Sequence, residues 1–185
     1  RNLTVSALRM PSHLESDETS AELVTKYVDM AASAGIDNVI VRIENFPSYE
    51  ALDEKLSSAI KRAENADVNI LFETIGYLSN TENVIGIITH FASAAIGASW
   101  NVRGTYFGAG ETAEATIKTL GAYIKYVRLG DMKDGKTVLI GEGDLDVKKL
   151  LGAIVIRNAL IKVQFTSHCS VQIIPPLKIL VQLNY

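Results

Sequence analysis

The stretch Val68-Asn69-Ile70-Leu71-Phe72-Glu73 is a short apolar run that ends in a carboxylate. A continuous apolar run of this length is typical of a strand that is buried on both faces of a parallel sheet. Similar runs recur along the chain at a spacing of roughly 30 residues, the size of one strand–helix unit. They cover residues 3–8, 38–43, 95–100 and 124–129.

Four amphipathic helices are expected after the first four strands, because apolar side chains recur there at three- and four-residue spacing. Capping residues and glycines indicate where these helices begin and end. The expected boundaries are a Thr19-x-x-Glu22 capping box and Gly35, Pro47-Ser48, a Ser79-x-x-Glu82 capping box, and finally Glu111 and Gly121.

Strands that alternate with helices predict an α/β fold with a parallel sheet and right-handed crossovers. Two arrangements fit: an open doubly wound sheet, or part of an eight-fold TIM barrel of ~250 residues. About five to six βα units in 185 residues are too few for a complete barrel. The barrel interpretation therefore predicts an incomplete TIM-barrel-like (β/α) repeat.

The composition is that of an ordinary globular protein, with 48% hydrophobic residues, 21% charged residues and a net charge of −3. Mild acidity argues against a nucleic-acid partner. The most apolar stretch, residues 171–183, is interrupted by Pro175 and Pro176, so we expect no membrane partner. The single cysteine, Cys169, cannot form an internal disulfide, which favours a cytoplasmic location.

The C-terminal part of the chain differs from the rest, because all 21 acidic residues lie at or before Asp146. We expect residues 1–151 to form the partial barrel. The acid-free segment 152–185 is expected to pack on the same domain, with candidate strands at 159–165 and 173–183. A homo-oligomer contact, fusion to a larger chain, and divergence or a changed reading frame at this end all remain open.

Polar side chains follow each predicted strand, where ligands of parallel α/β folds bind. Arginine occurs at four of these five positions, and it binds phosphate and carboxylate groups in a bidentate manner. The site is therefore expected to accept an anionic or polyhydroxylated small molecule. The residues at the strand ends are Arg9 and His13, Arg42 and Glu44, Glu73, Asn101 and Arg103, and Arg128 and Asp131.

Glu73 is the leading candidate for catalysis. It ends the apolar run and is followed by Thr74-Ile75-Gly76, a sharp turn. A carboxylate on a rigid strand end can ligate a divalent metal or act as a general base.

The segment Gly108-Ala109-Gly110-Glu111-Thr112-Ala113 matches the G-x-G-x-x-A dinucleotide pattern and predicts an NAD-binding oxidoreductase as a third function. The pattern does not follow its strand directly, since residues 103–107 intervene. The alternative interpretation is a loop that leads into a helix.

Four motifs in order resemble one known family: Ala98-Ser99-Trp100-Asn101, the loop and helix at 108–120, the strand at 123–131, and the turn Gly141-Glu142-Gly143-Asp144. This order resembles the sugar phosphate isomerase/epimerase family, the xylose isomerase-like and endonuclease IV-like TIM barrels. The similarity covers residues 3–151, and it corresponds to the barrel from about its third strand onward.

The resemblance implies a divalent cation (Mn, Mg or Zn) and proton transfer between adjacent sugar carbons. Glu73 matches the family's first metal-binding and catalytic glutamate, and Asp131 matches an aspartate after the later strand. Asn101 stands where the family has aspartate, and Arg128 where it has histidine. Arg128 cannot ligate a metal because it stays protonated. The final glutamate would lie after Asp146, where no acid occurs.

These observations predict an isomerase that acts on a phosphorylated or carboxylated sugar. The main alternative is a catalytically silent domain that binds a sugar anion on the same barrel. The expected partner is in each case a small-molecule sugar or sugar phosphate. The predicted residues are Glu73 for catalysis, Glu73, Asn101 and Asp131 for metal, and Arg103, Arg128, Arg42 and His13 for substrate.

Overall fold

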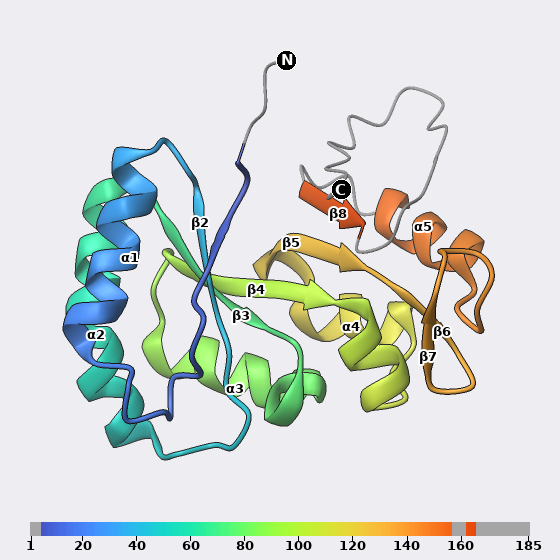
Figure 1. The fold of residues 1–185 in the computed structure, drawn as a ribbon, viewed down its shortest axis with the longest axis horizontal. Coiled ribbons are helices and arrows are strands. Elements are labelled where there is room, and N and C mark those ends of the chain that lie inside the picture. The colour runs from blue at the N-terminus through green and yellow to red at the C-terminus, as the bar shows by residue number, and fades with distance from the viewer. Residues whose placement is uncertain (1–4, 157–161, 166–185) are drawn as a thin grey trace.

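The computed structural model describes residues 5–156 and 162–165 (Figure 1). Within this part the chain forms a six-stranded parallel sheet in the order β1-β2-β3-β4-β5-β8. The strands are β1 (Leu8–Arg9), β2 (Asn38–Val41), β3 (Asn69–Glu73), β4 (Ile96–Asn101), β5 (Ile124–Leu129) and β8 (Lys162–Phe165).

Five α-helices of the described chain accompany this sheet. Because the strands follow one another in chain order, each crossover moves in the same direction around the sheet. That order is the order of a TIM barrel and differs from a doubly wound sheet, whose strand order reverses at a switch point. The expected incomplete barrel is confirmed. The helices are α1 (Ala21–Ser33), α2 (Tyr49–Ala66), α3 (Thr81–Phe91), α4 (Ala113–Leu120) and α5 (Val147–Ile156).

Apolar side chains are buried on both faces of the sheet, which explains the continuous apolar runs in the sequence. The larger core joins helices and strands and contains Phe72 and Trp100. A smaller cluster of Ile40, Leu71 and Tyr126 forms a second core. Ile40 pairs with Leu71, which lies two residues before Glu73, and Tyr126 is level with Glu73 through Ser99. The smaller cluster therefore lies on the same face of the sheet as Glu73.

Two of the four expected helices are capped by the residue that follows the expected cap. Ser20, and not Thr19, caps α1 by accepting a hydrogen bond from the amide of Leu23. Thr19 is buried and donates its hydroxyl hydrogen to the carbonyl of His13 instead. Likewise Asn80 caps α3 in place of Ser79, which ends the 3-10 helix η1 (Gly76–Ser79). In each case the polar residue one position later caps the helix.

The strand expected at residues 3–8 is described as the short strand β1 (Leu8–Arg9), and residues 3 and 4 lie outside the described residues. The C-terminal candidate at 159–165 is represented by β8, which pairs in parallel with β5. The candidate strand at 173–183 and Cys169 lie outside the described residues. Helix α5 runs through residues 151 and 152, the expected boundary between the two segments.

Further short elements lie next to β4 and β5 in the chain. A π-helix, η2 (Arg103–Gly108), leaves β4, and a 3-10 turn, η3 (Gly121–Tyr123), leads into β5. After β5 the chain forms an antiparallel hairpin of β6 (Asp131–Lys133) and β7 (Lys136–Val138). Among the helices described, none has the length and apolar character needed to cross a membrane.

Candidate functional site

Glu73 lies at the end of β3 with its side chain fully buried, and residues at the ends of three other strands are its partners. Its Oε1 atom accepts hydrogen bonds from Asn101 Nδ2 at 2.9 Å and from Arg128 Nη1 at 2.5 Å. Its Oε2 atom accepts from Arg9 Nε at 2.9 Å and lies 2.8 Å from Arg9 Nη2. Strand ends β1, β4 and β5 therefore converge on one carboxylate.

The charges around Glu73 decide its protonation state. Burial acts to raise the pKa of the Glu73 carboxyl, but the guanidinium groups of Arg128 and Arg9 and the hydrogen bond from Asn101 act to lower it. The net result is a pKa below the ordinary value. Glu73 is thus ionised at neutral pH and forms ion pairs with two arginines. It is a weak base while those pairs are in place.

Thr74 fixes the backbone of Asn101 in this arrangement. The Thr74 hydroxyl donates to the Asn101 carbonyl at 3.1 Å and accepts from the Asn101 amide N–H at 2.8 Å. Thr74 is itself fully buried. This exchange of two hydrogen bonds ties the end of β4 to the turn after β3, so the Asn101 side chain is held toward Glu73.

Arg42, at the end of β2, adds a further positive charge near this carboxylate. Its Nη2 atom donates to the carbonyls of Met10 and Pro11. Burial, followed by the charges of Arg9 and Arg128, lowers the pKa of Arg42. Repulsion among these guanidinium groups indicates a positive potential at this edge of the sheet, which attracts anions.

A cavity of about 470 Å³ opens beside Glu73. Two of its lining arginines, Arg103 and Arg128, have a buried Nε atom without a hydrogen-bond partner among the described residues. Gly104 allows the backbone of η2 to lie against the turn after β3, because a Cβ there would lie 1.8 Å from the carbonyl oxygen of Thr74. The lining residues are Arg9, Ile75, Gly76, Ser79, Asn101, Arg103, Gly104, Phe107, Gly108, Arg128 and Met132.

Asp131 has a different environment from the one expected for a metal ligand. Its Oδ1 atom accepts from the backbone N–H groups of Met132 and Leu145, and its Oδ2 atom from those of Gly141 and Gly143. A carboxylate has about four acceptor positions, so these four bonds use all of them. Asp131 therefore fastens the Gly141–Leu145 turn to the start of the β6–β7 hairpin.

The structure brings together part of the predicted set. Asn101, Arg103 and Arg128 line the cavity, and Glu73 accepts hydrogen bonds from Asn101 and Arg128. Arg42 lies close enough to interact with Arg9, Glu73 and Arg128. Asp131 and His13 are not part of this arrangement. His13 lies in the loop after β1, with its Nδ1 atom 4.0 Å from Glu15 Oε1.

The sequence analysis named Arg9 among the strand-end residues but left it out of the predicted substrate-binding set, although both of its contacts with Glu73 are to Oε2. The available signal was its position at the end of the first strand, the same signal that identified Arg42 and Arg128. The contributions of Ser79 and Gly108 to the cavity wall have no comparable signal, because both belong to segments between the sheet and the next helix.

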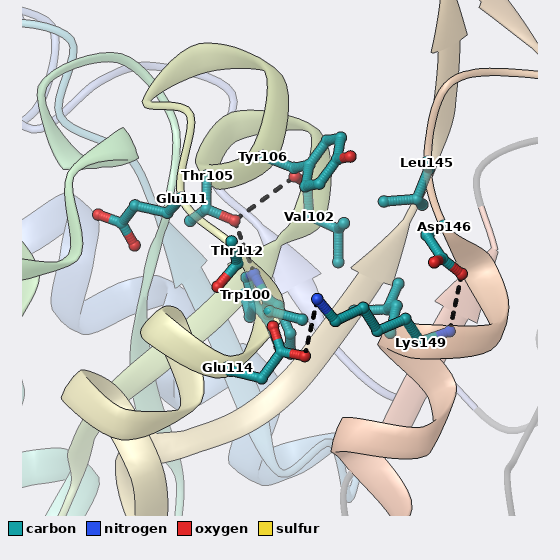
Figure 2. Close-up of a pocket in the computed structure, with 12 residues that line it drawn as sticks. Trp100, Val102, Thr105, Tyr106, Glu111, Thr112, Glu114, Leu145, Asp146 and Lys149 are labelled. Carbon is teal, nitrogen blue, oxygen red and sulfur yellow. Dashed lines mark hydrogen bonds and ion pairs between the residues drawn. The ribbon is translucent and has the colours of Figure 1, made fainter.

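A second, smaller cavity of about 190 Å³ lies between the N-terminal ends of α4 and α5 (Figure 2). Trp100 contributes to its floor and donates its indole N–H to Thr105 Oγ1 at 2.9 Å. Figure 2 shows Lys149 extending from α5 toward Glu114 of α4, with 3.4 Å between Nζ and Oε1.

The predicted dinucleotide pattern at residues 108–113 ends beside this smaller cavity. Thr112 caps α4, with its side chain accepting from the amide of Ala115. The Glu111 carboxylate accepts from the amide and hydroxyl of Thr81 and from the hydroxyl of Thr116. These bonds join α3 to α4.

The residues around Glu73 do not fit a divalent metal. Both of its oxygens are paired with guanidinium groups, and Asn101 is directed toward the same carboxylate through its N–H₂ donor. In the described part of the chain, no three His, Cys, Asp or Glu side chains are grouped so that they could hold a metal ion. A divalent cation at Glu73 would therefore have to displace a guanidinium group and face the remaining arginines.

Solved structures with this fold include sugar epimerases and related proteins. The xylose isomerase domain protein from Planctomyces limnophilus matches 89% of this chain and 71% of its own, with a TM-score of 0.73 and 15% identity. L-ribulose 3-epimerase matches 89% and 62%, with a TM-score of 0.73 and 14% identity. The IolI protein, solved with a zinc atom, matches 86% and 66%, with a TM-score of 0.69 and 17% identity.

The likeness identifies the fold as that of the xylose isomerase-like proteins, which confirms the expected resemblance at the level of the fold. No protein-family model matches the chain, and no curated protein matches it in sequence. The chain spans 62–71% of the length of the three structures.

Proposed function

We propose that the cavity beside Glu73 binds the anionic group of a phosphorylated or carboxylated sugar, and that the chain serves as a sugar-anion-binding domain. The observation that carries this proposal is the pair of arginines on the cavity wall, Arg103 and Arg128, whose buried Nε atoms have no hydrogen-bond partner among the described residues. A buried N–H donor without a partner is unfavourable, and an anionic ligand in the cavity would supply hydrogen-bond acceptors to these guanidinium groups.

The charge balance of the site supports an anion. Arg9, Arg42, Arg103 and Arg128 lie in or beside the cavity, and Glu73 neutralises one of these four charges. Guanidinium groups bind phosphate and carboxylate through paired hydrogen bonds. The cavity volume also falls in the range of roughly 300–1,000 Å³ that is common for small-molecule sites.

A sugar is favoured over a simple anion by two observations. Ser79 and Asn101 line the same cavity and offer hydrogen-bonding groups to hydroxyls. In addition, the fold is shared with L-ribulose 3-epimerase and with a xylose isomerase domain protein.

The proposal is tested by thermal unfolding and calorimetric titration with ribose 5-phosphate, gluconate, ribose and inorganic phosphate. The two anionic sugars should raise the melting temperature, because a ligand that binds only the folded state stabilises it by about 2.7 kcal/mol at a hundred times its Kd. Ribose should produce no shift. Inorganic phosphate should bind more weakly than ribose 5-phosphate.

The matched variants are Arg103→Gln and Arg62→Gln. Arg62 pairs with Asp29 on the helical surface and lies apart from the cavity lining. Arg103→Gln should weaken binding at least tenfold, as expected for the loss of roughly 1.5–3 kcal/mol from a charged hydrogen bond. Arg62→Gln should bind as the unaltered chain does. Equal binding of ribose and ribose 5-phosphate, or an unchanged affinity in Arg103→Gln, would show the proposal to be wrong.

A second candidate is sugar isomerisation or epimerisation, which the fold likeness supports. In that function Glu73 would be the general base, and it would accept a proton only after Arg9 or Arg128 moved away from its oxygens. Incubation of ketose phosphates in deuterated water tests this candidate, with and without manganese. Deuterium incorporation next to the carbonyl carbon, lost in Glu73→Gln, would support isomerisation.

A further inference from the structure

We infer that the guanidinium group of Arg128 is the resident cation of this site, and that it holds on Glu73 the place a divalent metal would take. The inference includes a consequence: the paired substitutions Arg128→His and Asn101→Asp should convert the site into one that binds zinc or cobalt(II).

The backbone register supports this inference. Asn101 of β4 pairs with Arg128 of β5, and Glu73 of β3 pairs with Ser99, two residues before Asn101. Residues two apart on a strand face the same side of a sheet. The side chains at positions 73, 101 and 128 therefore project from three adjacent strand ends to the same face of the sheet, with Glu73 two residues before the level of Asn101 and Arg128.

The contacts show that these side chains meet at one atom. Arg128 Nη1 and Asn101 Nδ2 both donate to Glu73 Oε1, at 2.5 and 2.9 Å. Three converging ligands with an open position are what a catalytic-type zinc site requires. The cavity that Asn101 and Arg128 line provides that open side.

The chemistry of the present residues explains why no metal fits. A guanidinium group carries only donors and stays protonated, and an amide whose N–H₂ is directed at Glu73 presents a donor there as well. Histidine and aspartate would replace these two donors with a nitrogen and an oxygen ligand. The same substitutions change the charge beside Glu73 from one cation and one neutral group to one neutral group and one anion, which favours a divalent cation.

The test compares zinc and cobalt(II) binding by the unaltered chain, by the double variant Asn101→Asp/Arg128→His, and by the control Asn101→Asp/Arg103→His. The control introduces the same residue types, but Arg103 makes no ion pair with Glu73 among those described. The readouts are bound metal after dialysis, the cobalt(II) absorption spectrum, and melting temperature with metal and then chelator.

We expect the unaltered chain to retain no stoichiometric metal and to melt at the same temperature in zinc and in chelator. The double variant should bind one equivalent of zinc at least 100-fold more tightly than the control. Its cobalt(II) spectrum should show low-symmetry nitrogen and oxygen coordination, and its melting temperature should rise with zinc and fall again with chelator.

Two results would overturn the inference. One is a single equivalent of metal on the unaltered chain that is lost in Glu73→Gln. The other is a folded double variant, checked by circular dichroism, that binds zinc no better than the control. If the double variant does not fold, Arg128→His alone serves in its place and is held to the same comparison with Arg103→His. Anion binding enters none of these readouts, so failure here is distinct from failure of the proposed function.

Discussion

At the scale of single residues, the Glu73 carboxylate holds together groups that would otherwise repel one another. Arg9 and Arg128 approach its two oxygens from opposite strands of the half-barrel. Removing one partner of a buried ion pair leaves the other charge uncompensated, which costs more than the pair contributes. Glu73 is therefore important to stability whether or not it takes part in a reaction.

Glu73→Gln should lower the free energy of unfolding by about 3 kcal/mol near neutral pH, because Arg9 and Arg128 lose their shared anion. The folded pKa of Glu73 lies below its unfolded value, so its contribution is present above the unfolded pKa, about 4.3. That contribution disappears as the pH falls through the folded pKa. Urea unfolding at several pH values should show the two chains converging in acid.

The control for this measurement is Glu114→Gln. Glu114 is exposed and pairs with the exposed Lys149, and a surface pair of this kind contributes little to stability. The control should unfold at nearly the same urea concentration as the unaltered chain. A constant difference between Glu73→Gln and the unaltered chain down to strongly acidic pH would contradict the assigned ionisation of Glu73.

At the scale of elements, the β6–β7 hairpin and the turn that follows it depend on one buried side chain. Asp131 accepts four backbone hydrogen bonds from this region. Gly143 is required there, because a Cβ would lie 2.1 Å from Asp131 Oδ1. The motif after β5 is thus a structural unit in which the aspartate and the glycine depend on each other.

Asp131→Asn should destabilise the protein by about 2 kcal/mol, because an amide N–H₂ would face backbone N–H donors that are left unsatisfied. Thermal unfolding measures the loss, and hydrogen exchange should become faster at the amides of Gly141 and Gly143. Asp134→Asn is the control, since Asp134 is exposed at the hairpin turn with a φ of 50°, where asparagine is well tolerated. Equal effects of the two substitutions would argue against the role assigned to Asp131.

At the scale of the whole molecule, the layer between sheet and helices is one continuous core that extends from α1 to α5. Trp100, the single tryptophan of the chain, is 1% exposed within it and lies beside the cavity between α4 and α5. Its fluorescence therefore reports on the later half of the sheet, while most helical residues lie in α1, α2 and α3.

Tryptophan fluorescence and far-ultraviolet circular dichroism should give coincident unfolding transitions, because one core joins the two halves. The emission maximum should move to longer wavelength as Trp100 becomes exposed. Arg62→Gln, on the helical surface, should leave both curves together. Two separated transitions would mean that the β4–β5 half unfolds independently of the first three units.

The class of fold follows from the sequence, because strand and helix periods are local properties of the chain. The run at 68–72 lies within one residue of β3, and Gly121 ends α4 as expected. Two helix caps were misplaced, because Thr19 and Ser79 each stand beside a second capping residue. Only packing decides which of two adjacent polar residues is free to cap, as the buried hydroxyl of Thr19 shows.

The sequence by itself determined the alternation of strands and helices, the arginines and the glutamate at the strand ends, and the likeness to a xylose isomerase-like barrel. The tertiary structure decided the direction in which the sheet continues and the partners of each charge. It placed Arg9 and Arg128 on Glu73 and gave Asp131 four backbone donors. Those pairings join residues up to 64 positions apart, and their energies depend on distance and burial, which no local pattern contains.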